Sequence, residues 1–187
     1  MDRLVFFSRS GATPPGKGAH ERVGQPDDYA KLWLADRNWR RVLSNFHESP
    51  SPFAYREAGS PLDGLRFRTI EHAFHALKFA RHHAAEAMRF AVESNDPIAL
   101  GPAAAARTWG RKLVRLSAEE LAEWDATKGD AMARAAECKF AADERARRVL
   151  AFTAPAELWH LEQNRGRAST LVRFEHLETL RPRFVDE

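Results

Sequence analysis

The chain contains little cysteine and no long apolar run. Cys138 is the single cysteine among 187 residues, so it can form no internal disulfide and belongs to no metal-ligand spacing. No stretch approaches the roughly 18 apolar residues that a membrane-spanning helix needs. The opening MDRLVFFSRSG lacks the apolar core of a secretory signal. These absences lead us to expect a cytoplasmic protein in a reducing compartment.

The chain also has no large excess of positive or negative charge. The 29 Lys and Arg residues nearly balance the 26 Asp and Glu residues, which leaves a net charge of +3. This balance is compatible with a polyanionic partner but is not that of a DNA-coating protein. Basic residues are scattered along the sequence, so no single stretch is indicated as a nucleic-acid track. Length and composition favour one domain over residues 1–187, with a Gly/Pro-rich segment at 1–38 and a core at 39–187.

Most of the remaining sequence has the signals of helices. Thr69 is a candidate N-cap for a helix that runs to about Glu93, and Asp96-Pro97 starts a shorter one that ends near Trp109. The capping box from Ser117 to Glu120 opens a long helical pattern, which we expect Gly129 to interrupt or bend. The segments VLSNF, LRF, WHLEQ and TLVRF predict short strands, NRGR a turn and EHLETLR a last helix. The predicted fold class is therefore α+β, predominantly α-helical.

The segment TIEHAFHALKF, residues 69–79, places polar groups beside an apolar stripe. Glu71, His75, Lys78 and His82 fall on one helical stripe that borders the core-facing side, as cleft walls do. Glu71 lies in the first turn, where the helix dipole favours a carboxylate. Lys78 can hold an anion or act as an amine nucleophile. The alternative is an inert surface pair bridged by His75.

Three further segments allow a structural or a functional interpretation. In T13-P-P-G-K-G-A-H the glycines and Lys17 can bring backbone amides to a phosphate, or form an ordinary surface loop. His72 points about 100° away from Glu71, which favours a structural histidine bonded to a backbone carbonyl. Cys138 lies in an Ala-rich helix, which predicts a buried and inert thiol.

Four blocks in order resemble the NADAR (YbiA-like) domain family, over roughly residues 41–152. The blocks are a Ser-Asn-Phe segment, the Thr-x-Glu-His helix, a Gly-Arg pair and a Trp-x-x-x-Lys-x-x-x-Met helix that ends in Lys-Phe. Here they are Ser44 to Phe46, Thr69 to Phe79, Gly110-Arg111, and Trp124, Lys128, Met132 and Lys139-Phe140. The resemblance implies a mostly helical α+β domain that cleaves N-glycosidic bonds without a metal or other cofactor.

The sequence can be compared with two branches of this family. One hydrolyses phosphorylated pyrimidine intermediates of riboflavin synthesis and ends in an Asp-x-x-Trp-Gly segment, which this chain lacks. The other removes ADP-ribose from guanine and often counteracts a DNA ADP-ribosyltransferase toxin. The segments Trp159-His160, Arg165 to Arg167 and Pro15 to Glu21 are similar to this second branch, the ADP-ribosylguanosine hydrolases.

The resemblance also implies roles for individual residues. Glu71 would stabilise the oxocarbenium-like centre, and Lys78 would act directly, either as a Schiff-base nucleophile or as a positioning charge. The expected ligand-binding residues are Asn45, Phe46, Lys17, Gly18, Gly110, Arg111 and Trp124. The alternatives are core rings for Phe46 and Trp124 and a local turn for Asn45.

The leading hypothesis is an enzyme, an N-glycosidase that removes ADP-ribose from guanine in DNA or RNA. Its partners would be the modified nucleic acid, the product ADP-ribose and, functionally, a toxin that adds the modification. One alternative is an N-glycosidase that acts on riboflavin-pathway intermediates. Others are a non-catalytic module that binds ADP-ribose or NAD, and an inert scaffold.

Overall fold

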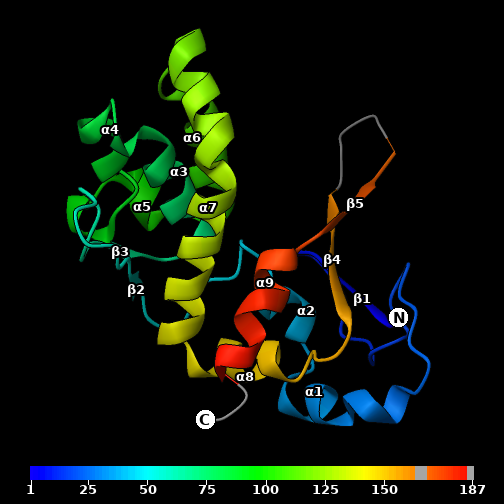
Figure 1. Ribbon diagram of the computed structural model, residues 1–187. Helices are drawn as coiled ribbons and strands as arrows, with labels where there is room; N and C mark the ends of the chain where they lie inside the picture. Colours follow the sequence, from blue (N-terminus) through cyan, green and yellow to red (C-terminus); the bar gives the residue numbers. More distant parts are fainter. Residues whose placement is uncertain (163–167, 185–187) are drawn as a thin grey trace. The chain divides into compact units, whose positions relative to one another are not determined.

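The computed structural model describes residues 1–162 and 168–184, which form two compact units (Figure 1). Unit 1 combines Met1–Ser44 with Glu144–Glu187, and unit 2 is Asn45–Asp143. Helices with a few short strands make up the described chain, which confirms the predicted fold class. No helix of residues 1–162 and 168–184 is both long and apolar enough to cross a membrane. The expectation of a single domain stays a prediction.

Unit 1 is built on a sheet whose strands come from both ends of the chain. Its strands are β1 (Arg3–Phe6), β4 (Glu157–Glu162) and β5 (Thr170–Arg173). β4 lies in the centre, parallel to β1 and antiparallel to β5. β4 and β5 confirm the strands expected near residues 158–174, whereas β1 lies in a segment for which no strand was predicted. The predicted NRGR turn lies outside the described residues.

Short helices complete unit 1. They are η1 (Pro26–Tyr29), α1 (Ala30–Ala35), α2 (Trp39–Val42), α8 (Glu144–Ala151), α9 (Glu175–Leu180) and η3 (Arg181–Phe184). The predicted strand VLSNF is wrong, because Val42 ends α2 and the Leu43 N–H continues the helical pattern by donating to the Trp39 carbonyl. α9 confirms the predicted last helix.

Aromatic rings and imidazoles pack together in unit 1. The Phe174 ring lies 5.4 Å from Phe6, 5.0 Å from His160 and 4.8 Å from His176, between ring centroids. Burial lowers the pKa of His176 to about 4. This imidazole is therefore neutral at neutral pH and packs as an aromatic ring.

A buried ion pair fixes the Gly/Pro-rich loop of unit 1. The fully buried Glu21 carboxylate accepts hydrogen bonds from the backbone N–H groups of Val5, Gly16 and Gly18, at 2.9 to 3.1 Å. Its partner is the buried Arg40 guanidinium, at 2.7 Å. Arg40 also donates to the backbone carbonyls of Thr13 and Pro14. Every oxygen of this carboxylate is paired, as a buried charge requires.

We predict that Glu21→Gln lowers the free energy of unfolding by about 3 kcal/mol, because it leaves the Arg40 charge buried without its counter-ion. Urea unfolding monitored by circular dichroism measures the change. The control Glu175→Gln neutralises an exposed carboxylate of the same unit and should cost less than about 1 kcal/mol. Equal effects of the two variants would contradict a structural role for the pair.

Unit 2 consists of helices and one small hairpin. The antiparallel pair β2 (Phe53–Ala54) and β3 (Arg66–Phe67) precedes α3 (Ile70–Ala80), and β3 confirms the LRF strand. The other elements are α4 (Ala84–Met88), η2 (Val92–Ser94), α5 (Pro97–Leu100), α6 (Ala103–Lys112) and α7 (Ala118–Ala142). α3 packs against α4, α6 and α7 (Figure 1).

Three predicted helix boundaries in unit 2 are wrong. α3 ends at Ala80 instead of near Glu93, and the chain turns at residues 81–83, whose side chains pair with carboxylates of α7. The helix predicted from Asp96 to Trp109 is divided into α5 and α6, because Pro102 holds the preceding Gly101 in an extended conformation. α7 continues through Gly129, since one exposed glycine costs a 25-residue helix only about 1 kcal/mol.

The predicted helix caps of unit 2 are confirmed. The Thr69 hydroxyl accepts from the His72 N–H, and the Asp96 carboxylate accepts from the Ile98 N–H. Ser117 and Glu120 form the reciprocal capping box of α7. These caps fix where α3, α5 and α7 begin, and hence which residues of α3 lie on one face.

Candidate active site

The first two turns of α3 place a carboxylate beside an imidazole. Glu71 is the second residue of α3, and its backbone N–H donates to the Asn45 carbonyl at 3.2 Å. Its side chain is largely buried, with Oε2 3.3 Å from His75 Nε2. This is ion-pair distance, but the angle is not that of a hydrogen bond. Glu71 and His75 therefore lie on one face of α3, as the sequence predicted, and both belong to unit 2.

Lys78 lies two turns further along the same face. Its Nζ donates to the Gly110 backbone carbonyl of α6 at 2.9 Å. Burial and, next, the neighbouring Arg111 charge lower the pKa of Lys78. A larger share of this amine than of an ordinary lysine is therefore unprotonated near neutral pH.

Gly110 brings α6 very close to α3. A Cβ atom at this position would lie 2.1 Å from His75 Nδ1 and 2.2 Å from His75 Cγ. Only glycine fits such an approach. The same residue supplies the carbonyl that holds Lys78, and Arg111 follows it in the last turn of α6. The Gly-Arg pair thus brings two predicted site residues to α3.

Asn45 and Phe46 precede the hairpin of unit 2. The Asn45 Nδ2 donates to Met132 Sδ of α7 at 3.2 Å. Its Oδ1 is buried and has no hydrogen-bond partner among the residues described, so it is available to accept from a ligand. Phe46 is half-buried, and the Arg107 guanidinium lies 5.8 Å from its ring centroid.

Trp124 packs at the contact between α7 and α3. Its ring centroid lies 4.9 Å from that of Phe74, which meets the His75 ring at 5.4 Å. Part of the Trp124 ring thus packs in the core, as one of the two interpretations from the sequence had it. The side chain is only half-buried, so the remainder is available for contact with a ligand.

Lys17 and Gly18 belong to unit 1, in the loop fixed by Glu21. The Gly18 N–H donates to Glu21, as does that of Gly16, so these amides are not directed at a phosphate in this structure. A Cβ at Gly18 would lie 2.7 Å from the Glu21 carboxyl carbon, which explains the glycine. Lys17 itself is exposed. Ligand binding by these two residues stays a prediction.

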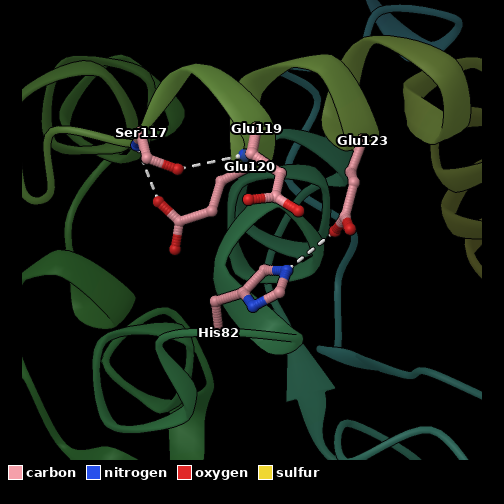
Figure 2. A pocket seen from close by; sticks show the side chains of 5 residues that line it. All are labelled: His82, Ser117, Glu119, Glu120 and Glu123. Carbon is pink, nitrogen blue, oxygen red and sulfur yellow. Dashed lines mark hydrogen bonds and ion pairs between the residues drawn. The ribbon is translucent and has the colours of Figure 1, made fainter.

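His82 does not join the stripe as predicted, because it follows the end of α3. It is exposed, and its Nε2 lies 2.8 Å from the Glu123 carboxylate of α7. With Glu123, Ser117, Glu119 and Glu120 it lines a hollow of about 330 Å³ (Figure 2). Three carboxylates repel phosphate, so this hollow does not suit an anionic ligand.

Two structural interpretations from the sequence are confirmed. His72 is completely buried, with Nε2 3.1 Å from the Ile98 carbonyl and Nδ1 2.8 Å from the Thr69 hydroxyl. Burial lowers its pKa, consistent with a neutral imidazole. Cys138 is buried, accepts from the Arg56 N–H at 3.3 Å and has a raised pKa. Both residues support the fold.

Sequence reasoning missed two contributors to the site. It placed His75 on the stripe with Glu71 but gave it a role only in the alternative, as a bridge of an inert surface pair, whereas the ring is buried between Glu71 and Gly110. It did not single out Arg107, which lies one turn before Arg111 and beside Phe46. The i, i+4 spacing of Arg107 and Arg111 is the signal that points to this second guanidinium. No cluster of His, Cys, Asp and Glu within the described part of the chain is arranged to hold a metal ion.

We predict that Gly110→Ala lowers the free energy of unfolding by about 3 kcal/mol, because its methyl group overlaps the His75 ring. Thermal or urea unfolding measures this. Gly129→Ala is the matched control: it lies in the middle of α7, and its Cβ would have nothing within 4 Å. Its expected effect is a gain of about 0.5–1 kcal/mol from helix propensity. A Gly110→Ala variant as stable as wild type would disprove the close approach.

Comparison with known proteins agrees with these features. The NADAR domain matches residues 32–164, which include most of the candidate site. The NMR structure of the Escherichia coli protein YbiA, a structural genomics target, superimposes with a TM-score of 0.50. It has 24% sequence identity, covers 79% of this chain and 77% of its own, and shows a similar fold. No curated protein matches the sequence. N-glycosidases occur among NADAR proteins, which supports a hydrolase role in general. The chain belongs to the NADAR domain family.

Proposed function

We propose that the protein is an N-glycosidase that removes ADP-ribose from guanine bases of nucleic acid, most simply DNA. The observation that carries this proposal is the face of α3, where a largely buried carboxylate and a lysine with a lowered pKa lie two turns apart. A carboxylate can stabilise the positive charge that develops in this bond cleavage, and an unprotonated amine can serve as its nucleophile.

Glu71 would act on the charge that develops during cleavage. As the bond between the ribose anomeric carbon and guanine lengthens, positive charge builds up on the ribose ring, and a carboxylate stabilises it. The same carboxylate orients the water that completes the reaction. The unpaired Asn45 Oδ1 would accept a hydrogen bond from a ribose hydroxyl or from the base.

Lys78 has two roles that fit its position. As a nucleophile, its unprotonated amine attacks the anomeric carbon, and guanine leaves with the bonding electron pair and takes up a proton. Opening of the ribose ring then gives an imine, which water hydrolyses to regenerate the amine. As a positioning group, the ammonium form would hold a ribose or phosphate oxygen. The lowered pKa favours the nucleophile.

The remaining predicted residues would bind the rest of the substrate. Arg111, held next to Lys78 by Gly110, would contact the diphosphate. Phe46 and the uncovered part of Trp124 would stack on a base. In this proposal the protein reverses the action of a DNA ADP-ribosyltransferase toxin and thus serves as its antitoxin, in the cytoplasm.

The test is release of free ADP-ribose from a guanine-ADP-ribosylated DNA oligonucleotide, in the presence of a chelator. We expect wild type to release ADP-ribose and Glu71→Gln to be slower by about 100-fold or more, since it removes the charge that stabilises the transition state. The control Glu123→Gln changes a carboxylate of the acidic hollow and should keep wild-type activity.

The outcomes separate the candidate functions. No release by folded wild type would exclude this substrate and leave a phosphorylated pyrimidine N-glycoside as the next one to assay. Binding of ADP-ribose without release from any substrate would identify a non-catalytic module.

We predict that Lys78 forms a covalent bond with substrate. Borohydride reduction during turnover should add the mass of reduced ADP-ribose to wild type, and Lys78→Arg should show no adduct. Because the pKa of Lys78 is lowered, the single-turnover rate should rise with pH and level off below the ordinary lysine value of 10.5. Activity in Lys78→Arg close to wild type, without an adduct, would instead assign a positioning role.

A further inference from the structure

α6 contacts the rest of unit 2 through a narrow edge. Ala103, Ala106 and Gly110 are its buried residues, and they lie on one side of the helix. Most residues of the outward side are exposed, and its charged or aromatic members are Arg107, Trp109, Arg111 and Lys112. Arg115, also exposed, follows in the connection to α7. We call Arg107, Trp109, Arg111, Lys112 and Arg115 the α6 surface.

The charge of the α6 surface is of one sign. The sequence from Ala103 to Leu116 contains four basic residues and no acidic one. Within the described chain none of these four forms an ion pair with a carboxylate, whereas Arg66, Arg68 and Arg89 of the same unit each do. Like charges at i, i+4, as in Arg107 and Arg111, destabilise a helix slightly. Arg111 and Lys112 suit the C-terminal end of the α6 dipole, but no carboxylate of the described residues neutralises the four cations, so their surface is complementary to a polyanion.

Trp109 adds an aromatic platform to these charges. Its side chain is 45% exposed, and in the part of the chain that the structure describes no ring stacks on it. Lys112 lies about one turn away, on the same outer side of α6. An indole beside unpaired cations is the combination that binds single-stranded nucleic acid, in which bases stack on rings and phosphates contact cations.

We propose that the α6 surface binds the nucleic-acid strand that flanks the modified guanine. Phosphates of the strand contact Arg107, Lys112 and Arg115, and a flanking base stacks on Trp109, whereas Arg111, whose charge acts on Lys78, binds the diphosphate of ADP-ribose. The strand lies next to the active site because Gly110, on the buried side of the same helical turn as Trp109 and Arg111, supplies the carbonyl that holds Lys78. This inference rests on the proposed function for its substrate, but the binding itself needs no catalysis.

The experiment uses an unmodified, fluorescein-labelled single-stranded DNA oligonucleotide and fluorescence anisotropy at low salt. Trp109→Ala should weaken binding about 5-fold or more. The double variant Lys112→Gln/Arg115→Gln should weaken it about 10-fold and reduce the slope of log K against log salt by about 1.4. The charge-matched control Arg66→Gln/Arg134→Gln removes two exposed, paired cations elsewhere in unit 2 and should bind like wild type.

A second measurement compares substrates of different size. Trp109→Ala and Lys112→Gln/Arg115→Gln should hydrolyse ADP-ribosyl-guanosine at the wild-type rate but lose kcat/KM on the modified oligonucleotide.

Equal DNA binding by wild type and these variants, or equal losses in the control, would overturn the inference. Displacement of the DNA probe by free ADP-ribose would also overturn it, because the surface would then hold the diphosphate. DNA binding that maps to α6 without hydrolysis of any substrate would uphold this surface and refute the proposed function.

Discussion

The contact between Gly110 and His75 is the constraint on which the candidate site depends. With no side chain at Gly110, α6 approaches α3 until its backbone touches the imidazole ring. That approach places the Gly110 carbonyl 2.9 Å from the Lys78 amine. Burial of the amine and, next, the nearby Arg111 charge lower the pKa of Lys78. On the other side of the same ring, His75 Nε2 lies 3.3 Å from Glu71. One interhelical distance thus sets the surroundings of both proposed catalytic residues.

In unit 2, negative charges gather at the start of α7 and positive charges along α6. At the start of α7, Glu119, Glu120 and Glu123 gather around His82 (Figure 2). Glu123 pairs with Arg81 and His82, and Glu120 pairs with His83. Along α6 the cations have no carboxylate partners in the described chain. Paired charges near a helix start act mainly in capping and packing. Unpaired cations beside a site remain available to a phosphate-bearing substrate.

The sequence predicted what depends on local signals. Thr69, Asp96 and Ser117 cap helices as expected, and the 3.6-residue period placed Glu71, His75 and Lys78 on one face. Family blocks then singled out Gly110-Arg111, although the reason for the glycine is a contact with a ring 35 positions earlier. No feature of the sequence near Gly110 predicts how close it lies to His75.

Long-range pairing also explains what the sequence missed. β1 forms a strand because β4, more than 150 residues later, offers a parallel edge. Glu21 and Arg40 are ordinary charges in the sequence, and only the fold shows that this buried pair takes up the amides of Gly16 and Gly18. The end of α3 at Ala80 depends likewise on partners in α7.

The most direct test of the central claim is a crystal structure of the Glu71→Gln variant with ADP-ribose, the product of the proposed reaction. We expect the anomeric carbon between residue 71 and the Lys78 amine, the diphosphate at Arg111, and Gly110 still against His75. ADP-ribose bound away from the face of α3, with Lys78 and residue 71 free of ligand, would contradict it.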